Sequence, residues 1–214
     1  MLRRDFKQFI SSIPNNVTIV AATKYVDEKI MHDLLDNGIN NFGENRTDSF
    51  LSKYPYFLNT NVKWHFIGHL QRNKALNIIN KIDYLHSLDS LKLAELINEN
   101  RKAPLKCFVE VSINLEETKN GVPFFEVENF IKELQKFDKI EVVGFMMMAI
   151  KNSDDDSLKN QFKKLKDLRD EIEMKLNIKL PYLSMGMSDD YLDAIEEGAT
   201  HIRLGRILFE GYEK

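Results

Sequence analysis

Eight short apolar segments, rich in β-branched and aromatic residues, recur along the chain with helical patterns between them. Such segments predict buried strands. They span residues 17–23, 40–43, 62–67, 84–87, 106–112, 142–149, 182–185 and 201–204. Because a helix between two strands returns the chain to the same edge of the sheet, this alternation predicts a parallel sheet.

The predicted helices cover residues 28–37, 73–80, 90–100, 125–137, 157–176 and 191–197. Gly38 and Gly198 follow two of them and are expected to act as C-terminal caps. At the start of the chain, Phe6, Phe9 and Ile10 have helical spacing, which predicts a short amphipathic helix rather than a signal peptide. The acidic run "DDDS" from Asp154 is expected to cap the helix that follows it.

Eight strand–helix units predict an α/β fold, a closed (β/α)8 barrel of the TIM type, although 214 residues is short for it. We expect residues 1–214 to form a single domain. The alternative is an open, doubly wound sheet. No G-x-G-x-x-G and no G-x-x-x-x-G-K-[ST] motif follows a strand, which weakens its nucleotide-binding form.

Net charge, cysteine count and the length of the apolar runs exclude or disfavour several classes of partner and site. The net charge of −3 gives no electrostatic reason to expect a nucleic-acid partner. The one cysteine, Cys107, excludes an intrachain disulfide and favours a reducing, cytoplasmic setting. No apolar run approaches the ~18 residues that a membrane span requires.

In a barrel, chemistry takes place at the carboxyl ends of the strands, and Lys24 follows the first strand in "VTIVAATKYV". Partial burial there would lower the pKa of its amine and leave it free to attack an aldehyde. The alternative is a solvated lysine at the end of a strand. This residue alone does not decide between them.

The last strand, in "HIRLGRILFEG", carries Arg203 between Ile202 and Leu204. If those two apolar side chains face the helices, Arg203 faces the barrel interior and requires a ligand or a structural ion pair. Gly205 lets the backbone approach a ligand, and the N–H groups of Gly205 and Arg206 are available to a phosphate.

A second phosphate candidate lies in "YLSMGMSDDYLDAI", where a strand leads through Gly186 into a helix. Ser184 or Ser188 and the neighbouring N–H groups are suited to an anion. Alternatively, Ser188 only caps the helix, with Asp189 and Asp190 in its first turn.

These features converge on one ligand, a phosphorylated aromatic aldehyde. Pyridoxal 5′-phosphate (PLP) fits, with its aldehyde on Lys24 and its pyridine nitrogen at Arg203. His65 and His69 have the spacing of a metal pair on a helix, but Gly68 separates a strand from a loop here. We therefore expect no metal site.

Several motifs resemble the pyridoxal phosphate homeostasis protein family, the type once named proline synthetase co-transcribed. They are "AATKYV", "NNFGENR", "WHFIGHLQRNK", "LHSLDSLKLA" and "LSMGMSDDYLDAIEEGATHIRLGRILFEG", which together span nearly the whole chain. The resemblance implies a barrel similar to the N-terminal domain of alanine racemase. It implies PLP bound to Lys24 as a Schiff base, the internal aldimine, and a role in PLP homeostasis.

The same resemblance implies further cofactor contacts. It favours Ser188 over Ser184 as the phosphate ligand, together with the backbone of Gly205 and Arg206. It places Asn45 and His65 at the mouth, against the cofactor ring or its hydroxyl. Lys119 matches a family motif and is either a second lysine near the mouth or a solvated loop residue.

Arginine at the pyridine nitrogen disfavours protonation of the ring and makes it a weak electron sink. Racemases of this type resemble two-base enzymes that take a tyrosine from a second, β-rich domain. We expect no such domain here, because the sequence reaches Lys214 just after the last strand. If the strand pattern continues, alternation turns Tyr25 away from Lys24. We expect a PLP carrier or reservoir without robust turnover and assign no catalytic residue.

The alternatives are a PLP-dependent amino-acid racemase, whose second base comes from elsewhere, and a barrel enzyme that acts on a phosphorylated metabolite. For the carrier, the expected partners are PLP and apo forms of PLP-dependent enzymes. A monomer is expected, without a nucleic-acid or membrane partner.

Overall fold

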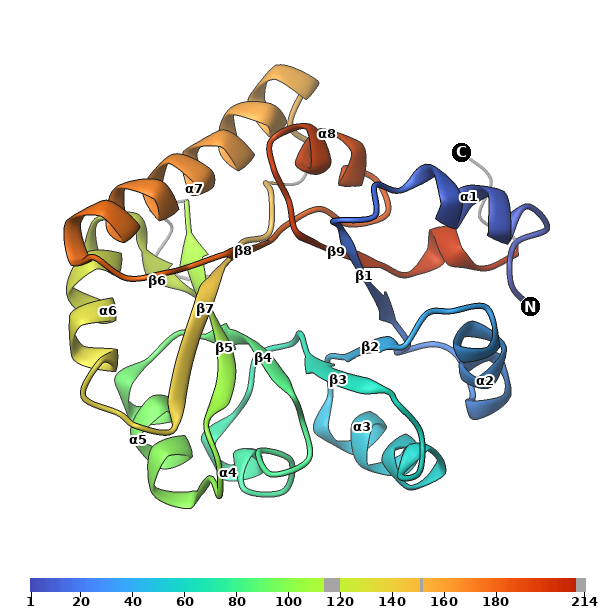
Figure 1. Cartoon of the computed structure of the whole chain (residues 1–214), viewed down its shortest axis with the longest axis horizontal. Coiled ribbons are helices and arrows are strands. Elements are labelled where there is room, and N and C mark those ends of the chain that lie inside the picture. The colour runs from blue at the N-terminus through green and yellow to red at the C-terminus, as the bar shows by residue number, and fades with distance from the viewer. Residues whose placement is uncertain (114–119, 151, 211–214) are drawn as a thin grey trace.

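The computed structural model describes residues 1–113, 120–150 and 152–210. Its strands surround a common centre and its helices lie outside them (Figure 1). The barrel strands are β1 (Thr18–Ala22), β2 (Asn41–Glu44), β3 (Lys63–Phe66), β4 (Tyr84–Leu88), β5 (Leu105–Ser112), β7 (Ile140–Met146), β8 (Tyr182–Ser184) and β9 (His201–Leu204). All neighbouring pairs are parallel.

The order in the sheet is β4-β3-β2-β1-β9-β8-β7-β5, and a β4–β5 pairing closes it. The predicted (β/α)8 barrel is confirmed, and the open sheet is excluded because no edge remains between β4 and β5. A two-residue strand that the sequence did not predict, β6 (Val122–Pro123), pairs with β5 outside the barrel.

Helices cover the outside of the barrel (Figure 1). They are α1 (Phe6–Ser12), α2 (Glu28–Asp36), α3 (Thr47–Lys53), α4 (Arg72–Ala75), α5 (Leu91–Asn100), α6 (Val127–Leu134), α7 (Asp155–Leu176) and α8 (Tyr191–Glu196). Short 3-10 turns are η1 (Tyr54–Phe57), η2 (Phe124–Glu126) and η3 (Arg206–Leu208). The sequence missed α3 and made α4 too long. None of the described helices is long and apolar enough to cross a membrane.

The ends of several helices agree with their predicted caps. Gly38 and Gly198 have φ angles of 88° and 94°, which only glycine adopts without strain. The side chain of Asp154 accepts a hydrogen bond from the Ser157 N–H, so the acidic run caps α7. These caps fix where each helix turns back toward the barrel.

Strand alternation divides the side chains into two layers. On β9, Ile202 and Leu204 join the large core between barrel and helices. Arg203 lies between them and therefore points into the barrel, opposite Val20 of β1. A separate apolar cluster of Phe108, Val143 and Met146 lies apart from that core.

Candidate functional site

Lys24 lies two residues beyond the end of β1, in a turn at the barrel mouth. Its side chain is exposed, and its Nζ atom lies 4.6 Å from the ring centroid of Tyr25. The strand pattern does not continue to Tyr25, because β1 ends at Ala22, so the Tyr25 ring lies beside the Lys24 amine instead of turning away from it. Within the described residues, the Lys24 amine forms no ion pair.

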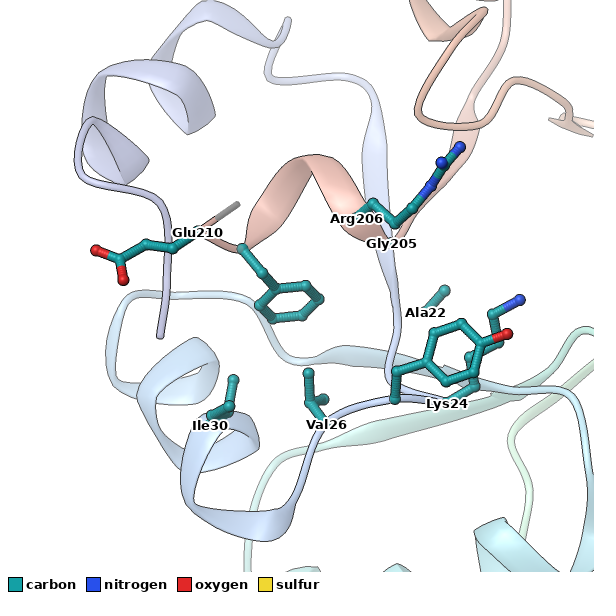
Figure 2. Close-up of a pocket in the computed structure, with 9 residues that line it drawn as sticks. Ala22, Lys24, Val26, Ile30, Gly205, Arg206 and Glu210 are labelled. Carbon is teal, nitrogen blue, oxygen red and sulfur yellow. The ribbon is translucent and has the colours of Figure 1, made fainter. Parts of the chain in front are cut away.

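A cavity of about 250 Å³ brings Lys24 together with Gly205 and Arg206 from the segment after β9. In Figure 2 the charged ends of Lys24 and Arg206 lie toward one end of this pocket, and Glu210 lies at the other. Apolar side chains complete the lining: Ala22, Val26, Ile30 and Phe209. The pocket therefore places the Lys24 amine in the same cavity as Gly205 and Arg206, whose backbone N–H groups the sequence predicts to bind phosphate.

A buried ion pair anchors the backbone immediately before Lys24. Glu44 is fully buried, and its Oε1 accepts hydrogen bonds from Thr23 Oγ1 at 2.6 Å and from Lys53 Nζ at 2.7 Å. Lys53 also donates to the Thr23 carbonyl oxygen at 2.6 Å. Helix α3, which the sequence did not predict, thus fixes the strand end that presents Lys24.

The two serine candidates occupy different environments. Ser188 Oγ accepts a hydrogen bond from the Gly205 N–H at 3.3 Å, beside the pocket. Ser184 is fully buried inside the barrel, where its Oγ bonds to Arg203 and His86. The geometry therefore favours Ser188 at the mouth. Ser188 is not a helix cap either, because α8 begins at Tyr191 after Asp190.

The two aspartates after Ser188 do not face the pocket as free charges. Asp189 forms an exposed ion pair with Arg206 at 3.0 Å. Asp190 accepts a hydrogen bond from the Met187 N–H. Each carboxylate is therefore engaged with a donor of its own, which lowers its repulsion of an anion held at Ser188 and Gly205.

Arg203 points into the barrel as predicted, and only 6% of it is exposed. Its Nη1 donates to Ser184 Oγ at 2.7 Å and its Nη2 to the Met147 carbonyl oxygen at 2.9 Å. Burial lowers the pKa of Arg203 to about 10, although Asp190 and Glu110 oppose that shift. The guanidinium remains a cation at neutral pH.

Asn45 lines a second groove of about 290 Å³, together with His69, Gln71 and Lys74. The loop after β3 packs against Asn45 at Gly68, where an added Cβ would lie 2.2 Å from the Asn45 carbonyl oxygen. Among the described residues, the buried side-chain oxygens without a hydrogen-bond partner are Asn45 Oδ1 and Glu44 Oε2. Asn45 thus has an uncommitted acceptor beside this groove.

His65 does not lie at the mouth, which corrects the sequence prediction. Its Nε2 bonds to Asn41, the first residue of β2, and its ring stacks on Tyr84, the first residue of β4. Both partners are the first residues of their strands, so the His65 side chain lies in the barrel interior toward the amino-terminal ends of the strands. The error arose because strand stagger in a barrel lets equivalent positions differ in depth.

Comparisons with known proteins place this geometry in a family. The family model for the alanine racemase N-terminal domain matches residues 2–213. A pyridoxal phosphate homeostasis protein from Aquifex aeolicus is 35% identical over 198 residues, which cover 91% of this chain and 87% of that protein. The chain belongs to the pyridoxal phosphate homeostasis protein family. The resemblance found in the sequence is confirmed.

A second member of this family, from Schizosaccharomyces pombe, is 34% identical over 98% of this chain and 89% of its own. Among solved structures, PipY from Synechococcus elongatus, solved with PLP bound, matches with a TM-score of 0.88 at 26% identity. That match covers 95% of this chain and 99% of PipY. An alanine racemase from Clostridium difficile shares the fold, with a TM-score of 0.81 at 16% identity over 58% of its length.

Glu110 on β5 is a buried carboxylate, 5% exposed, which the sequence patterns did not single out. Burial, followed by the charge of Asp89, raises the pKa of Glu110 to about 7, while Arg203 and His69 oppose the shift. Its position on β5, inward and near the strand end, was the available signal. Lys119 lies outside the described residues, so its role stays a prediction.

Proposed function

We propose that this protein binds PLP at the barrel mouth and serves in PLP homeostasis as a carrier or reservoir, without robust catalytic turnover. The observation that carries the proposal is one pocket in which the exposed Lys24 amine meets Gly205 and Arg206, with Ser188 bonded to Gly205. The relatives named pyridoxal phosphate homeostasis protein, and PipY solved with PLP bound, support it.

The residues present fit the cofactor. The side-chain Oδ1 of Asn45 has no hydrogen-bond partner, so this amide is not committed to another protein group and would contact the ring oxygen of PLP. Ser188, with the backbone of Gly205 and Arg206, would hold the phosphate, as N–H and O–H donors commonly do in barrels. Arg203 would face the pyridine nitrogen from below. His65 is not proposed as a direct contact, because it lies deeper in the barrel.

Lys24 would hold the cofactor covalently through its amine. PLP supplies an aldehyde and an electron-withdrawing ring. The Thr23–Glu44–Lys53 contacts fix the backbone from which Lys24 extends, so the amine returns to the same place after each release. An exposed lysine also leaves the attachment open to water and to competing amines, which suits a protein that gives up its cargo.

Arg203 argues against efficient chemistry at an amino-acid α-carbon. As a buried cation it opposes protonation of the ring nitrogen and so weakens the ring as an electron sink. We therefore propose no catalytic residue. The racemase alternative requires a second base that faces the cofactor, and it predicts exchange of an α-hydrogen in deuterated solvent.

All proposed contacts come from one chain, so we propose that residues 1–214 act as a single domain and that a monomer suffices. The buried, unpaired Cys107 is consistent with a reducing cytoplasm. Apo forms of PLP-dependent enzymes are the proposed recipients.

The test records the visible absorption spectrum after PLP is added, followed by borohydride reduction and mass mapping. The variants are Lys24→Ala and, as a matched control, Lys29→Ala, an exposed lysine of the neighbouring helix α2. We expect one adduct on Lys24, lost in K24A and kept in K29A. Adducts scattered over surface lysines, or none, would refute the proposal. Rapid α-hydrogen exchange would favour the racemase.

A further inference from the structure

A continuous chain of buried hydrogen bonds runs from Arg203 across the barrel interior. Ser184 Oγ lies 2.7 Å from Arg203 Nη1 and 2.8 Å from His86 Nδ1. His86 Nε2 lies 2.8 Å from His65 Nδ1, and His65 Nε2 lies 3.0 Å from Asn41 Oδ1. The five residues come from five strands: β9, β8, β4, β3 and β2.

The direction of this chain is fixed at the arginine. A guanidinium only donates, so Ser184 Oγ accepts from Arg203, and the serine proton must go to His86 Nδ1. His86 is then protonated at Nε2 and donates to His65 Nδ1. His65 in turn donates from Nε2 to Asn41 Oδ1. The Asn41 Nδ2 atom donates to Asn40 Oδ1 at 3.0 Å, which agrees with this orientation of the amide.

Both imidazoles are neutral in this arrangement. Burial lowers the pKa of His86 and of His65 well below the usual value, and neighbouring charge adds to the effect. Each ring also lies against an aromatic neighbour, with His86 4.3 Å from Phe108 and His65 4.4 Å from Tyr84 between ring centroids. Stacking holds the plane of each ring, and the hydrogen bonds fix which of its two flipped orientations it adopts.

We propose that Ser184, His86 and His65 are positioning residues, which hold the guanidinium of Arg203 in one orientation toward the cofactor ring. The second bond of Arg203, to the Met147 carbonyl oxygen, fixes the other side of the guanidinium plane. The inference rests on the proposed function, because the object that Arg203 would face is the ring of PLP.

A histidine pair that merely fills the barrel is the competing explanation, and the two make different predictions. A filler requires only the ring shape, so phenylalanine would replace His86 without loss. A positioning chain requires an acceptor at the place of Nδ1, because without it the Ser184 hydroxyl rotates and Arg203 loses a fixed partner. Asparagine supplies an acceptor at that place, and phenylalanine does not.

The first measurement is the ¹⁵N spectrum of the histidine side chains in the full chain without PLP at neutral pH. We expect His86 and His65 as neutral rings protonated at Nε2. In Ser184→Ala, the Nδ1 signal of His86 should move, because its donor is gone. Rings protonated at Nδ1, or an unchanged His86 signal in S184A, would refute the proposed series of hydrogen bonds.

The second measurement is the PLP dissociation constant of folded His86→Phe, His86→Asn and the control His201→Phe. His201 is a buried histidine in the same interior. It bonds to Thr200 and is not part of the series of hydrogen bonds from Arg203 to Asn41. We expect H86F to weaken PLP binding about tenfold, the upper end of what one neutral hydrogen bond contributes. H86N should recover most of that loss, and H201F should stay within about twofold of the native value.

The outcomes separate the two claims. If the imidazole signals are as expected but the native protein binds no PLP, the hydrogen-bond chain stands, and both the proposed function and the positioning role fall. If PLP binds on Lys24 and H86F binds as tightly as the native chain, the proposed function stands and the positioning role is refuted. Equal losses in H86F and H201F would assign the effect to packing and also refute it.

Discussion

Two basic side chains, Lys24 just after β1 and Arg203 on the neighbouring strand β9, lie in opposite environments. Lys24 follows β1, is exposed and forms no ion pair within the described part of the chain. Arg203 belongs to β9, is 6% exposed and donates to Ser184 and Met147. The contrast suggests a division of labour: a reactive amine is left uncommitted, while a cation that recognises a ring is fixed in advance.

The energies of the two positions follow from this difference. A solvated lysine keeps its hydration, so its removal should hardly change the stability of the fold. A buried arginine loses its hydration and depends on each hydrogen bond that replaces it. Mutations around Arg203 should therefore change the stability of the fold, whereas mutation of Lys24 should change its reaction with PLP and leave the stability nearly unchanged.

The largest effect is expected from acid, through the buried histidines of the interior. Burial, then the charge of Arg203, lowers the pKa of His201 to about 4, and the pKa values of His65 and His86 are lowered as well. The unfolded chain then binds more protons, so stability is full above pH 6.5 and falls as pH drops toward 4. His201 alone should account for about 3 kcal/mol.

Urea unfolding at neutral pH and near pH 4.5 checks this prediction, with His201→Phe as the comparison. The variant should lose less stability on acidification than the native chain. An equal loss in both would show that His201 does not contribute to the acid sensitivity.

The same substitution at the two cations tests the comparison directly. Arg203→Met should lower the free energy of unfolding by about 2–3 kcal/mol, because it leaves the Met147 carbonyl oxygen without its donor. Lys24→Met should change it by less than about 0.5 kcal/mol. Urea midpoints of the two variants measure the difference, and similar midpoints would break the proposed contrast.

Glu110 should give a smaller pH effect of the opposite sign. Its pKa is raised to about 7 by burial and by Asp89, so the folded state holds its proton longer than the unfolded chain does. Its contribution is full below pH 4.5 and is lost as pH rises through 7, by about 3 kcal/mol. Glu110→Gln should flatten that part of the stability profile, measured by urea unfolding; a profile like that of the native chain would contradict the assignment.

The smallest effect is expected at Ser188. Ser188→Ala should weaken PLP binding about fivefold, since it removes one neutral hydrogen-bonding group at the proposed phosphate position. Ser188 is bonded only weakly to Gly205, so stability should hardly change. Spectroscopic titration with PLP, beside Ser157→Ala on α7 as a control, measures the affinity. A matching loss of affinity in both variants would exclude a local role for Ser188.

Much of this architecture was predictable from local patterns. The eight barrel strands follow from apolar runs, and the inward direction of Arg203 follows from its place between Ile202 and Leu204. Helix α3 was missed, because Thr47–Lys53 carries few apolar residues and gains its burial from the barrel through Phe50. Tyr25 was misplaced because the exact end of β1 depends on its pairing with β2.

The sequence determined which residues are present at the ends of the strands, since Lys24, Asn45, Ser188, Gly205 and Arg206 each follow a recognisable apolar run. It did not determine depth or partnership. Only the closed barrel shows that Ser184 and His86, 98 positions apart, form a hydrogen bond while Ser188 remains at the mouth. The physical reason is that strand stagger and closure set which inward side chains meet, and neither leaves a local signal in the chain.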